Sequence, residues 1–418
     1  MKHFLNIIFS AVSVALLIPC LAGQSVTTDR ADAIYKCGEN AVFTVQPFPG
    51  ASGKLKGILS LDGGNVLKTV EFEAAKGSRI SGSLKTPGVL QLRVTGTAGG
   101  KKVELLSGAA FDPFKIQPGG AAPADLRRFW EEEKAKAEKF PLDPKVTRLE
   151  KFCNSKYSSY EVSFAVPDGR VYGFLCIPKS SRPLPALIGI EPSGIGRNTP
   201  VVNQFGNRFA VLWMNVHNFP PTMEPAARNK MWRALNKPFF ARINSHDRYK
   251  QYYHRVLTGL CRAVDHLASR PEIDAERIGA FGVSQGGGLA LMLTAIHPRI
   301  KAVCANVPAL CDHHGFKQGR RPGWPRMVER NNKATSVCAS YYDAALLASW
   351  IKVPCWIIGG LIDTTCPPAS VCAAFNRVQS KEKYLILEPG MGHASRPSYG
   401  KALGKMRKYI EQSVPVKK

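Results

Sequence analysis

The chain has 418 residues, of which 57 are lysine or arginine and 31 are aspartate or glutamate, so its formal net charge is +26. That length allows two or three domains of typical size, about 100 to 200 residues each. No zinc-finger spacing or RNA-binding signature accompanies the charge, which argues against a nucleic-acid-binding protein. The charge then serves solubility, or it attracts acidic glycans or an anionic cell surface.

The first residues have the three-part layout of a secretory signal peptide. Positive charge at Lys2 precedes an apolar run over residues 7–18, and small residues follow at Ala22 and Gly23. We therefore expect residues 1–23 to be a signal peptide and the protein to be secreted or periplasmic. The apolar run is short for a membrane span, and no later stretch is long and apolar enough to be one.

The segment that follows reads as all-β. Short apolar or alternating runs recur there, separated by Gly, Asp-Gly and Gly-Gly. This spacing predicts a small β-sandwich of the immunoglobulin-like class over residues 24–112. No cluster of its residues looks catalytic. The predicted strands are Ala41–Val45, Leu55–Leu61, Thr69–Phe72, Val89–Val94 and Val103–Leu106.

A linker and a charged helix come next. Residues 113–123 are rich in Pro, Gly and Ala, which indicates a linker between domains. A helix is predicted from Ala124 to about Phe140, with Asp125 in its first turn, where the helix dipole favours an acidic side chain.

From Ser158 onward, apolar runs of strand length alternate with helical stretches. The clearest helix spans Tyr252–Ala268, with apolar residues on one face. The alternation predicts a doubly wound, mostly parallel sheet, and we expect residues 124–418 to form one α/β domain. The predicted strands are Tyr160–Ala165 and Val171–Ile177 in a hairpin, then Ala186–Ile190, Phe209–Val216, Ile278–Val283, Ala302–Val307, Val353–Ile358 and Tyr384–Leu387.

Residues 281–289, Phe-Gly-Val-Ser-Gln-Gly-Gly-Gly-Leu, contain the Gly-x-Ser-x-Gly pattern of a nucleophile elbow. The pattern alone is weak evidence, because a glycine-rich chain produces it by accident. Here Ser284 lies between a predicted strand and a predicted helix over Gly287–Ile296. Glycines on both sides allow the sharp turn that exposes a serine hydroxyl. We therefore predict that Ser284 is a nucleophile.

Two further candidates follow Ser284 in the chain. Asp363 follows a predicted strand in Gly-Gly-Leu-Ile-Asp, and His393 follows the last predicted strand in Gly-Met-Gly-His. Serine, then aspartate, then histidine is the order of an α/β-hydrolase triad. The alternative for Asp363 is a cap for the helix that begins near Pro367 and Pro368. The order of all three residues favours the triad.

An oxyanion hole needs two backbone N–H groups. One is predicted at Gln285, directly after the nucleophile, and the other in the loop after Ala186–Ile190. Pro192 in that loop has no N–H group, which leaves Ser193 and Gly194 as equal candidates.

The segment from Tyr252 to Asn376 resembles the family of acetyl xylan esterases and cephalosporin C deacetylases. The resemblance implies an α/β-hydrolase fold and serine ester hydrolysis, and it extends from about Ala124 to the C-terminus without the β-rich front. The matching pieces are Arg270-Pro-Glu-Ile-Asp-Ala-Glu-Arg-Ile-Gly279, Ser284-Gln-Gly-Gly-Gly-Leu-Ala290, Ser340-Tyr-Tyr-Asp343, Gly360-Leu-Ile-Asp-Thr-Thr-Cys-Pro-Pro368 and Ala373-Ala-Phe-Asn376.

The chain departs from the family pattern at several places. The family usually has Arg-Gly-Gln-Gly where this chain has His217-Asn218-Phe219-Pro220, and Glu where this chain has Ala394. An aromatic residue expected in the oxyanion loop is also missing. The triad is untouched, so the departures bear on substrate shape and on contacts in an oligomer.

These observations predict an exported serine carbohydrate esterase that removes acetyl groups from acetylated glycans or oligosaccharides through an acyl-enzyme intermediate. No metal or organic cofactor is implied. The partner is an acetylated carbohydrate, with an acidic glycan as one option, and the family resemblance favours a homo-oligomer. The alternatives are a peptidase or another short-chain esterase of the same fold, and a non-catalytic glycan-binding protein that keeps the hydrolase fold.

Overall fold

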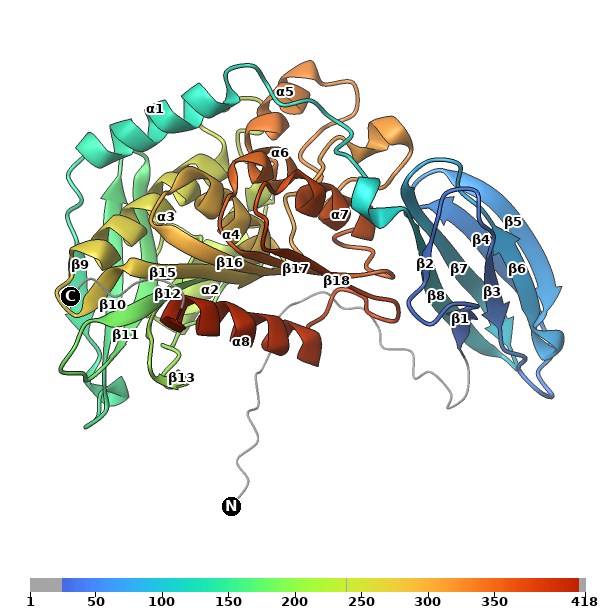
Figure 1. The fold of residues 1–418 in the computed structure, drawn as a ribbon, viewed down its shortest axis with the longest axis horizontal. Helices are drawn as coiled ribbons and strands as arrows, with labels where there is room; N and C mark the ends of the chain where they lie inside the picture. The colour runs from blue at the N-terminus through green and yellow to red at the C-terminus, as the bar shows by residue number, and fades with distance from the viewer. Residues whose placement is uncertain (1–24, 238, 413–418) are drawn as a thin grey trace.

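The computed structural model describes residues 25–237 and 239–412. The predicted signal peptide lies outside these residues. Figure 1 shows a large α/β body beside a smaller all-β unit built from the N-terminal part of the chain. No helix of the described residues is long and apolar enough to cross a membrane.

The N-terminal unit consists of two β-sheets that share a hydrophobic core, as the alternating pattern predicts. One sheet has the strand order β2-β8-β7-β4-β5 and the other the order β1-β3-β6. Phe43, Leu92 and Phe111 are fully buried between them. Three strands were not predicted from the sequence: β1 and β2, which are very short, and β6, which is short and polar. The strands are β1 Val26–Thr28, β2 Ile34–Tyr35, β3 Ala41–Val45, β4 Lys54–Leu61, β5 Val66–Glu73, β6 Ser78–Gly82, β7 Gly88–Ala98 and β8 Lys101–Phe111.

The α/β body is built on a sheet with the order β18-β17-β16-β15-β12-β14-β11-β10-β9. Its strands from β18 to β14 run parallel, and the predicted hairpin β10–β11 adds antiparallel strands at one side. The chain therefore has the predicted α/β-hydrolase fold. The strands of this sheet are β9 Lys145–Arg148, β10 Tyr157–Val166, β11 Gly169–Pro178, β12 Leu184–Ile190, β14 Ala210–Met214, β15 Ile273–Val283, β16 Ile300–Asn306, β17 Cys355–Gly360 and β18 Lys383–Glu388, and β13 Gln204–Asn207 lies outside it.

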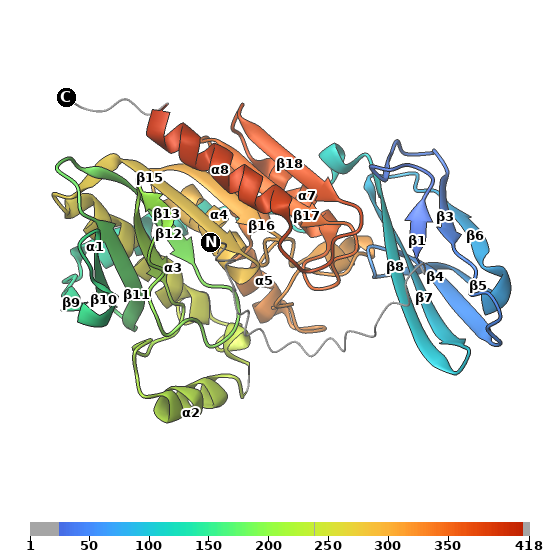
Figure 2. The ribbon, with the colours of Figure 1, turned by 90° about the horizontal axis from the view of Figure 1, so that it is seen from below.

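Helices cover both faces of this sheet. Figure 1 shows α8 on one face and α3, α4 and α7 on the other, and Figure 2 shows α2 projecting away from the body. The predicted 124–140 helix is α1, which begins at Leu126. Asp125 precedes it and accepts hydrogen bonds from Arg248 and Tyr341, so a tertiary contact replaces the predicted first-turn role. The helices are α1 Leu126–Lys139, α2 Pro225–Leu235, α3 Tyr252–Ser269, α4 Gln285–Ile296, α5 Lys333–Tyr341, α6 Ala344–Leu347, α7 Pro368–Arg377 and α8 Pro397–Gln412.

The two units share apolar contacts where they meet. Val89, Ala110 and Ile116 belong to the same buried cluster as the core of the α/β body. The side chain of Asn376 in α7 donates to the carbonyls of Pro113 and Ile116 in the predicted linker, both at 2.8 Å. The predicted linker is thus an ordered part of the interface.

The ten cysteines of the described residues are all free thiols, and eight of them are buried. Cys176, Cys304 and Cys355 lie in strands of the central sheet, where free cysteine packs as a small hydrophobic side chain.

Candidate active site

Ser284 lies between the end of β15 and the start of α4, in a backbone conformation that is rare for any residue but glycine. Its φ is 56° and its ψ is −122°. Neighbouring glycines make this turn feasible. A Cβ atom on Gly282 would lie 2.3 Å from the Gly286 backbone, and one on Gly286 would lie 2.0 Å from the carbonyl oxygen of Ile190. The strand, the helix and the adjacent strand β12 therefore meet backbone to backbone beneath the serine.

The structure brings Ser284, His393 and Asp363 together in one hydrogen-bonded chain. The Ser284 Oγ lies 2.9 Å from His393 Nε2, and His393 Nδ1 lies 2.8 Å from Asp363 Oδ2. Ser284 is nearly buried, Asp363 is fully buried, and the His393 side chain remains 29% exposed. A hydroxyl, an imidazole and a carboxylate in this order can pass a proton from the serine to the histidine while the carboxylate fixes the ring.

The Asp363 carboxylate is held from both sides. Its Oδ1 accepts hydrogen bonds from the backbone N–H groups of Thr365 and Cys366, at 2.8 and 2.9 Å. Its Oδ2 faces His393. The predicted alternative for Asp363, a cap on the next helix, contributes only these local turn bonds, because α7 begins later, at Pro368.

Asn306, at the end of β16, connects the nucleophile to the histidine loop. Its backbone carbonyl accepts from the Ser284 N–H at 2.9 Å, and its side-chain amide donates to Ala394 O and Ser395 Oγ. Sequence reasoning missed this residue. The available signal was an asparagine at the end of the apolar run 302–307, in the strand beside the elbow strand.

The predicted oxyanion residues lie around the elbow. Gln285 is the first residue of α4, where backbone N–H groups have no acceptor within the helix. Its side chain is fixed, because the Tyr253 hydroxyl donates to Gln285 Oε1 at 2.9 Å. Gly194, in the loop after β12, has a φ of 131°. Ser193 precedes it, and neither amide is singled out by the geometry.

Side chains from other parts of the chain form hydrogen bonds to the backbone carbonyls of the loop after β12. Arg228 of α2 donates to the consecutive carbonyls of residues 195, 196 and 197. His217 Nε2 lies 2.7 Å from Gly194 O, and its Nδ1 lies 2.7 Å from the Tyr252 hydroxyl. Burial lowers the pKa of His217 to about 4, so the ring is neutral and Nε2 carries the proton that it donates. His217 is therefore bonded to the loop and not to Ser284.

The Cys366 thiol lies beside the triad, and its sulfur is within 4.8 Å of a ligand atom of Asp363 and of His393. Burial raises the pKa of this thiol well above its usual value, so the thiol stays protonated. Since the thiolate is the form that binds metals, these residues make a poor metal site.

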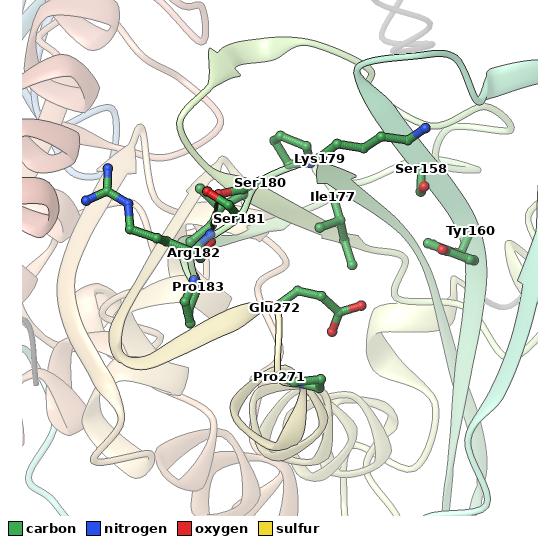
Figure 3. Close-up of a pocket in the computed structure, with 12 residues that line it drawn as sticks. Ser158, Tyr160, Ile177, Lys179, Ser180, Ser181, Arg182, Pro183, Pro271 and Glu272 are labelled. Atoms are coloured by element: carbon green, nitrogen blue, oxygen red, sulfur yellow. Dashed lines mark hydrogen bonds between the residues drawn. The ribbon is translucent and has the colours of Figure 1, made fainter. Parts of the chain in front are cut away.

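A pocket of about 350 Å³ lies elsewhere, beside the first residue of β12, Leu184. Figure 3 shows Lys179 and Arg182 extending in opposite directions at its rim, and Glu272 between them. None of its lining residues belongs to the predicted site, because Ser284 follows the opposite, carboxyl ends of the parallel strands. The chemistry therefore belongs to the elbow and not to this pocket.

The parallel sheet, the elbow and the position of the serine at the carboxyl ends of the strands are those of a hydrolase with the α/β-hydrolase fold. The family model for acetyl xylan esterase (AXE1) matches residues 114–410. The chain belongs to the acetyl xylan esterase family. The N-terminal β-sandwich, whose last strand ends at Phe111, lies entirely outside the match.

Known relatives agree with this assignment. Acetyl esterase Axe7A from Xylanibacter ruminicola is 29% identical over 316 residues, which are 73% of this chain and 71% of the relative. An acetyl xylan esterase structure from Paenibacillus sp. R4 is 25% identical, with a TM-score of 0.61 over 72% of this chain and 98% of that one. Acetyl xylan esterase 1 from Thermoanaerobacterium sp. JW/SL YS485 is 22% identical, with a TM-score of 0.58 over 71% and 97%, and shows the same fold.

Proposed function

We propose that this protein is an exported serine esterase that removes acetyl groups from acetylated glycans. The observation that carries the proposal is the hydrogen-bonded chain from Ser284 through His393 to Asp363 on a strained elbow. Family membership gives the substrate class, since the matched family is that of acetyl xylan esterases. Export rests on the signal-peptide pattern of residues 1–23.

The mechanism follows from the order in which the three side chains contact one another. Ser284 Oγ attacks the acyl carbonyl while His393 Nε2 takes the serine proton, and Asp363 stabilises the resulting imidazolium. The imidazolium then gives that proton to the leaving sugar alcohol, which leaves an acetyl-serine. Water, deprotonated by His393, attacks the acetyl group, and acetate and free Ser284 are released.

The developing oxyanion needs donors that point at it before the reaction. We assign the Gln285 N–H as one donor, because this amide is free of helical bonds and its residue is anchored by Tyr253. The second donor is the Ser193 or Gly194 N–H. Hydrogen bonds from Arg228 and His217 to the carbonyls of this loop support the proposal that its N–H groups are held in a fixed position.

The charge of the molecule and one cavity favour an acidic glycan. A cavity of about 530 Å³ lies between residues 63–65 of the β-sandwich and residues 316–326 of the α/β body. Arg321 and Arg326 line it, and the ring of Phe316 is 44% exposed at its edge. Guanidinium groups bind carboxylates and an exposed ring can stack on a sugar, so this cavity suits a uronic-acid substituent.

Substitution of the nucleophile tests the mechanism. Ser284→Ala should fold normally and lose about a million-fold in kcat on a chromogenic acetate, as removal of a triad serine does elsewhere. His393→Ala should behave alike, and Asp363→Ala should lose less. Ser180→Ala, an exposed serine far from the elbow, is the matched control. A folded and active Ser284→Ala variant would falsify the assignment and favour a different catalytic group.

Acyl-chain length tests the substrate class. kcat/KM should fall from acetyl to butyryl and longer chromogenic esters, because overfilling a small rigid pocket costs about 1 to 3 kcal/mol. A preference for long chains would indicate a lipase-like enzyme, and cleavage of amides would indicate a peptidase. Binding of acetylated glycan without any acetate release would indicate the non-catalytic alternative.

A further inference from the structure

The β-sandwich contacts the segment that carries Asp363 at both of its ends. Gln91 of β7 donates from its side-chain amide to the carbonyl of Leu361 at 3.0 Å. Asp62, in the turn after β4, accepts from the backbone N–H of Ala369 at 3.1 Å. Asp363 lies between these two contacts in the chain. The β-sandwich therefore holds the segment on both sides of Asp363.

A third contact holds the middle of the segment. The Arg321 guanidinium donates to Thr364 O at 3.1 Å and to Gly63 O, next to Asp62, also at 3.1 Å. Thr364 directly follows Asp363. Arg321 therefore bridges the β-sandwich and the residue beside the predicted triad acid.

The approach at Gln91 is close and buried. Gln91 is only 3% exposed, and Gly108 lies opposite it on β8. A Cβ atom on Gly108 would lie 2.3 Å from Leu361 O, the same carbonyl that accepts from Gln91. The glycine lets the sheet approach the Asp363 segment backbone to backbone.

Asp62 supplies a helix cap that the α/β body lacks. Helix α7 begins directly after the Asp363 segment, and its N-cap residue is Pro367, which has no side-chain acceptor. Asp62 satisfies the Ala369 N–H in the first turn of α7 from the other unit. Asp62 is 1% exposed, and its backbone φ is 50°, so this carboxyl occupies a built and constrained position.

We propose that Gln91 and Asp62 are positioning residues, through which the β-sandwich fixes the 361–369 segment so that Asp363 stays aligned with His393. The inference rests on the proposed function, and it gives the domain outside the family match a role in the reaction. The contacts at Leu361, Thr364 and Ala369 limit motion of the loop in which Thr365 and Cys366 hold Asp363 Oδ1. The rate of the reaction depends strongly on the positions of the catalytic groups, because a misplacement of about 1 Å can lower the rate about a hundred-fold.

The test uses point variants of the full chain and a small chromogenic acetate. Gln91→Leu removes one anchor and Asp62→Ala the other. We expect each to lower kcat about tenfold and the double variant about a hundred-fold, with KM within about threefold of the parent. Asp62→Asn keeps an acceptor for Ala369 and should retain most of kcat. Gln46→Leu makes the same side-chain change at an exposed site of the β-sandwich and should change nothing.

A spectroscopic readout separates positioning from mere stability. The proton shared by His393 Nδ1 and Asp363 should give a far-downfield proton resonance, which Asp363→Asn should abolish. We expect this resonance to weaken or shift in Gln91→Leu and in the double variant below their melting temperatures. If Asp62→Ala does not fold, Gln91→Leu and Asp62→Asn still carry the test.

Unchanged kcat and an unchanged resonance in folded Gln91→Leu would overturn the inference. A loss of kcat that merely follows the unfolded fraction would also overturn it. An inactive parent protein would instead contradict the proposed function, and the resonance would then still report whether the β-sandwich aligns Asp363 with His393.

Discussion

Gly286 is the residue on which the elbow depends most directly. It lies under the nucleophile, where a methyl group would sit 2.0 Å from the backbone oxygen of Ile190. Because β12 is a central strand of the sheet, neither backbone can yield without cost to the sheet.

We therefore expect Gly286→Ala to lower the melting temperature and to abolish activity. Overpacking of a rigid site costs about 1 to 3 kcal/mol or more. Gly400→Ala is the control, because a Cβ atom there meets nothing within 4 Å and the residue lies inside α8. Alanine should raise the helix propensity at Gly400 and stabilise the protein by about 0.5 to 1 kcal/mol. Equal effects of both substitutions on melting temperature would contradict this interpretation.

Buried histidines make the stability of the fold sensitive to acid. Burial lowers the pKa of His266 to about 4, against the ordinary value of 6.5, and the charge of Arg270 acts in the same direction. Between those pH values the unfolded chain binds more protons at this site than the folded one does. The contribution to stability is therefore present above pH 6.5 and is lost as the pH falls toward 4.

His266→Leu should remove this acid sensitivity. The buried Nε2 of His266 has no hydrogen-bond partner within the described part of the chain. The centroids of the His266 and Phe164 rings lie 4.8 Å apart. The free energy of unfolding of the variant, relative to the parent, should rise by about 2 to 3 kcal/mol between pH 7.5 and pH 4.5. Urea titrations at both pH values measure it, with the exposed His246→Leu as control. A constant difference would contradict the neutral buried ring.

The loop after β12 is the element whose shape the proposed oxyanion hole requires. His217 holds it through Gly194 O, and Arg228 holds its next carbonyls. The family pattern places an arginine where this chain has His217, so a neutral donor fills a position that is usually cationic.

His217→Leu should lower kcat by about ten- to a hundred-fold, somewhat less than removal of an oxyanion donor itself. KM should change little, because His217 is fully buried beneath the loop. His217→Gln keeps an N–H donor and should restore part of kcat. His266→Leu, assayed at pH 8, controls for the loss of another buried histidine, which lies in the last turns of α3. Full activity of His217→Leu would show that the loop holds its shape without this bond.

The long buried strands and the elbow were predictable, and the contacts between distant segments were not. The strands around Ser284 carry continuous apolar runs. Because these strands are parallel, Ser284, Asp363 and His393 all follow carboxyl ends that lie on the same side of the sheet. Strand β6, Ser78–Gly82, is short and polar and carries no such signal. The roles of Gln91 and Asp62 depend on partners 270 and 307 residues away. No periodicity encodes such a pairing, so only the folded structure could show it.

At the scale of the whole molecule, the net charge of +26 bears on the proposed preference for an acidic glycan, which can be tested at the cavity between the two units. Arg326 is exposed at the cavity between the two units, whereas Arg321 is engaged by Gly63 and Thr364. Arg326 is thus the better probe of substrate binding, because its removal leaves the contacts of the Asp363 segment in place.

Arg326→Ala should raise KM about three- to tenfold for an acetylated glycan that carries uronic acids. A salt-screened surface contact of this kind is worth about 1 kcal/mol. The parent's preference for that glycan over a neutral acetylated glycan should shrink as salt rises from 0.05 to 0.5 M. Activity on the small chromogenic acetate should not change. Lys102→Ala, on the far hairpin of the β-sandwich, is the charge-matched control. Equal KM values for both glycans in the parent would remove the case for an acidic substrate.

The free cysteines have a consequence for the survival of the protein after the proposed export. Eight of the ten described thiols are shielded only by the folded core, and no disulfide ties the described chain together. Burial also raises the pKa of Cys304 and Cys311, so little reactive thiolate exists while the core is closed. Once the core opens in an oxidising medium, those thiols can cross-link in wrong pairs before refolding. Under the proposed export, the lifetime of the enzyme is then set by its unfolding rate, and reductant should turn an irreversible heat inactivation into a reversible one.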